Sequence, residues 1–81
     1  MRIIGQSART DVPYERVILK VRLEGNWKLE AYEMGDDCMT SWVLGIFRDR
    51  GAALAAHSRI LADYADGKKV SRVAADNARS E

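Results

Sequence analysis

The sequence predicts an α+β fold in which a three-stranded antiparallel β-meander packs on one α-helix. Three segments rich in β-branched and aromatic residues, at residues 14–24, 27–34 and 40–47, are separated by short breaks that contain glycine. A segment at residues 49–66 then repeats its apolar residues every three or four positions, as one face of a helix does. We therefore expect one domain over residues 1–81, with the helix covering one face of the sheet.

The first two strands form a hairpin whose register follows from which side chains share a face. Apolar and polar residues alternate along both segments, as in strands with one buried face. A two-residue loop would set Leu23 opposite Lys28, whereas a three-residue loop, Glu24-Gly25-Asn26, pairs like with like. The longer loop gives the inner pairs Leu23 with Trp27, Val21 with Leu29 and Leu19 with Ala31, and the outer pairs Arg22 with Lys28, Lys20 with Glu30 and Ile18 with Tyr32. The opposite charges of Lys20 and Glu30 favour this register by about 0.2–1 kcal/mol.

The third strand can face the helix in two ways. Period alone slightly favours the set Trp42, Leu44 and Ile46 over the set Val43, Gly45 and Phe47. Gly45 marks either a close approach of the helix backbone or a β-bulge.

The helix has clear start and stop signals. Asp49 can accept hydrogen bonds from the first free amides, and Gly67 can take the left-handed conformation that ends helices. Its apolar face is expected to carry Ala53, Ala56, Ile60, Leu61 and Tyr64.

The two ends of the chain are less strongly patterned. Residues 1–13 are expected to form a short strand or an arm followed by a turn at Pro13. After Gly67 a short helix is possible, and residues 75–81 are expected to fray. The apolar residues available to such a helix are Val70, Val73 and Ala74.

Composition excludes several classes of protein. No apolar run is long enough to cross a bilayer and no signal-peptide pattern is present, so we expect a cytoplasmic protein without a membrane partner. A formal net charge of +1 gives no general attraction to nucleic acid. Because 81 residues bury only a modest core, a homodimer is also open.

Candidate catalytic and metal-binding residues are few. His57 is the one histidine and sits on the predicted helix beside its buried face, where a structural role is the simplest interpretation. Cys38 has no basic neighbour to activate its thiol, and the adjacent Asp36 and Asp37 are typical of a solvated turn. No nucleophile, phosphate or dinucleotide motif is present. We therefore expect no enzyme activity, no catalytic or metal-ligating set and no cofactor.

The outer face of the sheet is the candidate functional surface. A sheet ribbon with basic side chains can enter the major groove of DNA, where arginine and lysine reach guanine acceptors and phosphates. The alternative is an ordinary solvated face with mixed charges. The side chains expected there are Lys20, Arg22, Lys28, Glu30 and Tyr32.

Two stretches of the chain resemble a known family. The run Trp42-Val43-Leu44-Gly45-Ile46-Phe47, followed by Ala53, Ala56, His57, Ser58 and Arg59, is similar to the last strand and helix of the ethylene-response-factor (APETALA-type) DNA-binding domain. Upstream, Val21-Arg22 and Gly25-Asn26-Trp27-Lys28-Leu29-Glu30 resemble its basic first strand, glycine turn, tryptophan and glutamate.

The resemblance covers residues 16–67, and related sheets occur in integrase arm-binding domains. It implies a sheet that lies in the major groove, with Lys20 and Arg22 at DNA-contacting positions, Glu30 at a second-strand glutamate and Trp27 in the core. Tyr32, Ser41 and Val43 stand where that family has arginine, arginine and tryptophan.

Two functions of different classes follow. The first is a small DNA-binding or regulatory protein that binds double-stranded DNA through the outer face, with Lys68 and Lys69 as further contacts. The second is a phage- or mobile-element-type interaction module or inhibitor that binds a larger host protein. Its anchor would be Ile18, Tyr32 and whichever of Trp42 or Val43 faces outward. A continuous positive surface would favour DNA, and a flat apolar patch would favour a protein partner.

Overall fold

The computed structural model describes residues 1–35 and 40–74, and it contains two three-stranded sheets and one α-helix. One sheet has the strand order β3-β4-β5, formed by β3 (Val17–Glu24), β4 (Asn26–Glu33) and β5 (Ser41–Phe47). The predicted antiparallel meander packed on a helix is therefore confirmed. A single 3₁₀ turn, Tyr14–Arg16, occupies the first positions of the segment expected to be strand.

The hairpin register is the one that the three-residue loop predicts. Leu23 lies opposite Trp27, Val21 opposite Leu29, and the pairs continue without a break to Val17 opposite Glu33. Gly25 has a φ of 75°, which a residue without a Cβ adopts at little cost at the tip of the hairpin. Like-with-like facing was thus sufficient to set this register.

A β-bulge decides which side chains of β5 face the helix. Leu29 of β4 lies opposite Gly45 but the next residue, Glu30, lies opposite Val43, so Leu44 is an extra residue on β5. The extra residue changes the alternation. Trp42, Leu44 and Phe47 pack into or against the core, while Val43 and Ile46 are exposed. Neither predicted set holds as a whole, because a strict period of two assumes a strand without a bulge.

The helix α1 (Arg50–Ala65) begins and ends at the predicted signals. The Asp49 carboxylate accepts a hydrogen bond from the Ala52 amide at 2.8 Å, and Gly67 has a φ of 76°. The buried helix residues are Ala53, Ile60 and, against expectation, Asp63. Leu61 and Tyr64 of the predicted apolar face are nearly half exposed.

The second sheet brings the two ends of the described chain together. Its order is β2 (Asp11–Pro13), β1 (Arg2–Ile4) and β6 (Val70–Arg72), with β1 antiparallel to β2 and parallel to β6. The short helix that the sequence left open after Gly67 is therefore wrong, since β6 occupies that segment. Residues 1–13 supply two strands instead of a loose arm. The fraying expected for residues 75–81 lies outside the described residues.

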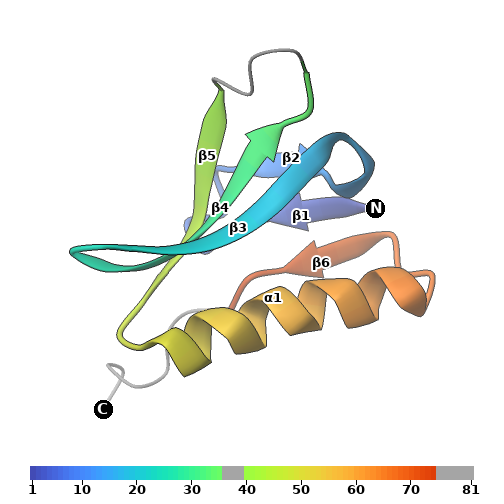
Figure 1. Ribbon diagram of the computed structural model, residues 1–81. Helices are drawn as coiled ribbons and strands as arrows, with labels where there is room; N and C mark the ends of the chain where they lie inside the picture. Colours follow the sequence, from blue (N-terminus) through green and yellow to red (C-terminus); the bar gives the residue numbers. More distant parts are fainter. Residues whose placement is uncertain (36–39, 75–81) are drawn as a thin grey trace.

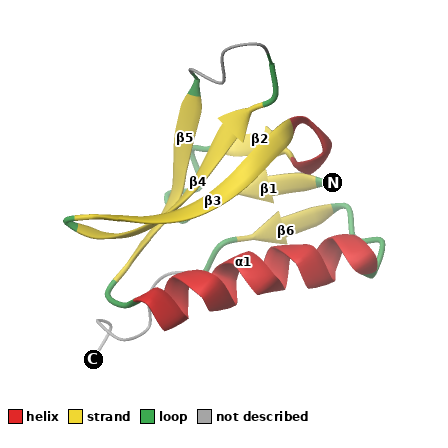
Figure 2. Ribbon diagram, in the orientation of Figure 1, coloured by secondary structure: helices red, strands yellow, loops and turns green. Residues whose placement is uncertain are grey.

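Figure 1 shows how these parts are layered. The helix runs along one side of the molecule, β6 lies between it and β1, and the sheet β3-β4-β5 rises above them. Figure 2 shows that α1 covers one side of this sheet alone, so that in the described part of the chain no helix covers its other side. The core combines residues from both sheets and the helix, including Ile3, Leu29, Leu44, Phe47 and Ile60. Among the described residues, no helix is both long and apolar enough to span a membrane.

Candidate functional site

The side of the sheet β3-β4-β5 that faces away from α1 is the candidate functional surface, called here the outer sheet face. The five outer-face residues predicted from the sequence all lie on it, because the register of β3 and β4 is as predicted. The two lysines predicted to join them, Lys68 and Lys69, lie in the connection between α1 and β6, on the helix side of the sheet. The outer sheet face consists of Ile18, Lys20, Arg22, Glu24, Lys28, Glu30, Tyr32, Val43 and Ile46.

Glu30 is the centre of this face and is only 4% exposed. Arg22 donates from Nε to the Glu30 carboxylate at 2.7 Å, and the Tyr32 hydroxyl donates to the same oxygen, Oε1, at 2.8 Å. Two donors on one carboxylate oxygen hold both side chains flat against the sheet. A buried carboxylate is tolerated here because it is paired and hydrogen-bonded.

The titration of these groups reflects the same contacts. The pKa of the Glu30 carboxyl lies below its ordinary value, chiefly because Arg22 donates a hydrogen bond to it, and burial only partly opposes this. The pKa of Arg22 is raised, chiefly by the bond to Glu30. The pKa of Tyr32 is also raised, since its hydroxyl proton is held by the carboxylate. At neutral pH the Glu30 carboxyl is therefore ionised, Arg22 is positively charged and the Tyr32 hydroxyl is neutral.

The remaining charges of the face are arranged around this centre. Glu24 accepts from Arg22 at 2.8 Å and from Lys28 at 3.4 Å. Lys20 does lie opposite Glu30 in the ladder, but its ammonium sits 5.1 Å from the centre of the Tyr32 ring. The predicted cross-strand position of Lys20 opposite Glu30 is therefore confirmed, and the hydrogen bonds to the Glu30 carboxylate come from Arg22 and Tyr32.

Three apolar side chains on this face remain exposed. Ile18, Val43 and Ile46 are 41%, 43% and 46% exposed, and Trp42 packs against the core instead. The question that the sequence left open is thus decided for Val43. The set that the period slightly favoured places Ile46 on the inner face, and only the bulge at Leu44 reveals its outward position.

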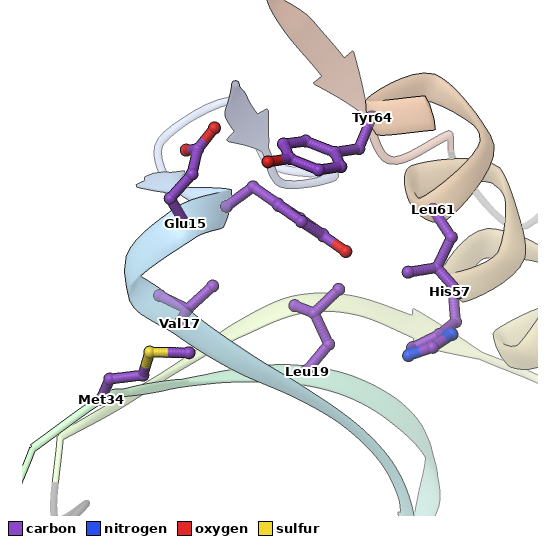
Figure 3. Close-up of a pocket in the computed structure, with 8 residues that line it drawn as sticks. Glu15, Val17, Leu19, Met34, His57, Leu61 and Tyr64 are labelled. Atoms are coloured by element: carbon purple, nitrogen blue, oxygen red, sulfur yellow. The ribbon is translucent and has the colours of Figure 1, made fainter. Parts of the chain in front are cut away.

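A groove lies on the other side of β3, between this strand and α1. It has a volume of about 390 Å³, within the range of small ligand pockets. The Tyr14 and Tyr64 rings both line it and stack with their centroids 4.3 Å apart. Figure 3 shows Val17 and Leu19 on the β3 side of the groove, with His57, Leu61 and Tyr64 on the helix side. No local sequence pattern indicates this groove, since its walls come from segments about 40 residues apart.

A second buried carboxylate, Asp63, links α1 to β6. The Ser71 hydroxyl donates to Asp63 Oδ2 at 2.7 Å, and the Lys68 ammonium and Arg59 guanidinium lie 3.4 and 3.5 Å from Oδ1. Hydrogen bonding from Ser71, followed by the contact with Lys68, holds the pKa of Asp63 below its ordinary value. The hydrogen bond from Ser71 joins β6 to α1, and the contact with Asp63 holds the Lys68 side chain on the helix.

The remaining residues considered from the sequence are His57, Cys38, Asp36 and Asp37. His57 is half-buried on the wall of the groove. Cys38, Asp36 and Asp37 lie outside the described residues. Within residues 1–35 and 40–74, no three His, Cys, Asp or Glu side chains are grouped so as to hold a metal ion.

Comparisons with known proteins add no assignment to this geometry. None of the family models, curated proteins and solved structures compared with the chain matches it.

Proposed function

We propose that the chain is a non-catalytic protein-interaction module whose outer sheet face binds a larger protein. The observation that carries this proposal is the combination on one face of three exposed apolar side chains with charges that largely neutralise one another. Protein interfaces favour such a surface, with apolar and aromatic residues at the centre and polar residues at the rim.

The charges of the face explain why a protein partner is preferred to duplex DNA. A sheet that reads DNA needs arginine and lysine groups free to contact phosphates and base edges. On this face Arg22 is engaged by both Glu24 and Glu30, and Lys28 lies next to Glu24. Binding to phosphates would separate these pairs and would bring the carboxylates close to DNA.

The Lys20 ammonium and the exposed apolar side chains of the outer sheet face indicate the chemistry of the partner surface. Lys20 joins none of the ion pairs formed among the described residues and lies against the Tyr32 ring. Its ammonium is therefore available to a carboxylate of the partner. The complementary surface is an apolar patch that covers Ile18, Val43 and Ile46, with an acidic group opposite Lys20.

The test is capture of a partner by variants that change only the outer sheet face. The variant Val43→Glu with Ile46→Glu places two charges in the apolar patch, whereas Leu54→Glu makes a similar change on the exposed side of α1 and serves as the control. We expect wild type and Leu54→Glu to capture the same protein, nuclease treatment to make no difference, and the double variant to lose at least about tenfold in affinity for the purified partner.

The same preparation decides between protein and DNA. Binding to a labelled duplex is measured by fluorescence anisotropy over a range of salt concentrations, with Arg22→Ala as the test variant. Micromolar binding at physiological salt that Arg22→Ala weakens would replace this proposal with the DNA-binding function. It would also bring Lys68 and Lys69 back as candidate phosphate contacts.

A further inference from the structure

The two edges of the sheet β3-β4-β5 are treated differently. At the β5 edge, the Gln6 amide donates to the Leu44 carbonyl at 2.8 Å. The Gln6 side chain accepts from the Ile46 amide at 2.8 Å and lies 3.4 Å from the Ile46 carbonyl. The Gln6 residue thus occupies positions that a neighbouring strand would take. This edge is therefore covered at Leu44 and Ile46.

The β3 edge is open over most of its length. The Met34 amide donates to the Arg16 carbonyl at 3.0 Å, which in an antiparallel ladder makes Val17 and Glu33 a non-hydrogen-bonded pair. By alternation, the backbone groups of even-numbered β3 residues point to β4. Those of Leu19, Val21 and Leu23 point away from the sheet, where the strand order of residues 1–35 and 40–74 places no further strand.

The protection of β3 against pairing with another chain is limited to its charged side chains, Lys20 and Arg22. Proteins protect exposed edges with charged residues, prolines, bulges, very short strands or covering segments. Here β3 has eight residues, no proline and an unbroken register with β4. Its free N–H and C=O groups form a template that only another extended backbone can satisfy in full.

The groove beside β3 would take side chains of an added strand. Val17 and Leu19 point into it from β3, and Leu61 and Tyr64 form the opposite wall (Figure 3). Successive side chains of a strand point to opposite faces, so every second side chain of a new neighbour would enter on the Val17 and Leu19 side. The apolar walls favour apolar side chains there.

The charges on the other face select the kind of strand. A second copy of the chain that paired antiparallel through Leu19, Val21 and Leu23 would place Lys20 opposite Arg22 of that copy, and like charges in directly opposed positions are destabilising. Carboxylates at those outer positions would instead complement Lys20 and the exposed Arg16. The favoured occupant is therefore a strand with acidic residues outside and apolar residues inside.

We propose that the β3 edge binds an extended segment of a partner protein in which acidic and apolar residues alternate, by adding it to the sheet as a new strand. This inference rests on the proposed function, of which it specifies the mode of binding. The added strand would lie at the border between the groove and the outer sheet face.

The experiment uses the full chain labelled with ¹⁵N and a synthetic nine-residue peptide that alternates valine and glutamate. We expect the amides of Leu19, Val21 and Leu23 to exchange with solvent at least about tenfold more slowly when the peptide is bound. A matched peptide with lysine in place of glutamate is the control and should bind at least about tenfold more weakly.

Two variants test the contacts separately. Val21→Pro removes one outward-pointing amide and no bond to β4, and it should weaken peptide binding at least about tenfold. Lys20→Glu should weaken binding of the glutamate peptide and strengthen that of the lysine peptide, and this exchange of preference remains measurable even if Val21→Pro fails to fold.

Several outcomes would overturn strand addition. The first is unchanged hydrogen exchange at the amides of Leu19, Val21 and Leu23, and the second is equal binding of the two peptides. The third is a dimer of the chain alone that Val21→Pro abolishes, because a second copy would then be the strand that pairs with β3. Peptide binding should survive Val43→Glu with Ile46→Glu. If that double variant abolishes partner capture while the peptide never binds, the proposed function stands without this binding mode.

Discussion

Glu30 shows how one residue can give order to an otherwise exposed surface. Its carboxylate is buried on the side of the sheet that no helix covers within the described residues, and Arg22 and Tyr32 both donate hydrogen bonds to it. Fixing long side chains in one position costs conformational entropy, but that cost is met during folding and not on contact with a partner. The side chains at the centre of the outer sheet face are thereby ordered by folding alone.

We predict that Glu30 stabilises the folded protein only while its carboxyl group is ionised. Its pKa is lower in the folded protein than the ordinary value of about 4.3, so the contribution is complete above that value and is lost as the pH falls through the folded pKa. The difference in unfolding free energy between wild type and Glu30→Gln should therefore shrink between about pH 5 and pH 3. Urea denaturation at a series of pH values measures it.

A matched control is available on the same strand. Glu33→Gln changes an exposed carboxylate at the end of β4, and its difference from wild type should stay small throughout this range, within about 0.5 kcal/mol. A difference for Glu30→Gln that stays constant from neutral to acidic pH would contradict the assigned network.

At the scale of elements, the sequence predicted which side chains of β3 and β4 point to each face of the sheet, but not which side chains of β5 do. The β3-β4 register could be derived because each residue pair obeys the same alternation and the loop length is read directly from the sequence. The β5 facing could not, because the inserted Leu44 shifts the alternation and only Gly45 signals it. Gly45 is closely packed, since a Cβ there would lie 2.8 Å from the Phe47 ring.

The covered β5 edge was also beyond prediction from the sequence. Gln6 is a polar residue in a turn, and its contact with Ile46 joins positions 40 residues apart. No local pattern indicates such a contact. The candidate residues on β3 and β4 were found because they depend on local alternation, whereas the groove and the edges depend on how distant segments meet.

We predict that Gln6→Ala exposes the β5 edge locally. The Ile46 amide loses its acceptor, so its exchange with solvent should become at least about tenfold faster. Hydrogen exchange followed by NMR measures this, with the Leu29 amide in the centre of the sheet as the internal control. Equal acceleration at Ile46 and Leu29 would indicate global destabilisation and would contradict a local role for Gln6.

At the scale of the molecule, the fold depends on a sheet that joins the first and last strands of the described residues. β1 and β6 pair in parallel, with Ile3 opposite Ser71. The Ile3 side chain is completely buried in the core. Three-residue strands carry too little pattern to be recognised in a sequence, and a parallel pairing of distant segments has no turn that announces it. The helix is fixed to this sheet through Asp63 and Ser71.

We predict that the two sheets unfold as one cooperative unit, because they share a single core. Ile3→Ala removes buried atoms from the small sheet and should lower the free energy of unfolding by about 2–5 kcal/mol. Both tryptophans, Trp27 and Trp42, lie in the other sheet and report on it by fluorescence. Their unfolding midpoint in urea should shift together with that of circular dichroism.

The control for this prediction is Ile18→Ala, the same substitution at an exposed position of the outer sheet face, which should change stability by no more than about 0.5 kcal/mol. If Ile3→Ala leaves the tryptophan transition in place and adds a separate, earlier step by circular dichroism, the small sheet is an independent unit. The β3 edge and the outer sheet face would then be stabilised by β3, β4, β5 and α1 without a contribution from the small sheet. A coincident shift means instead that the binding surface owes its stability to contacts on the far side of the molecule.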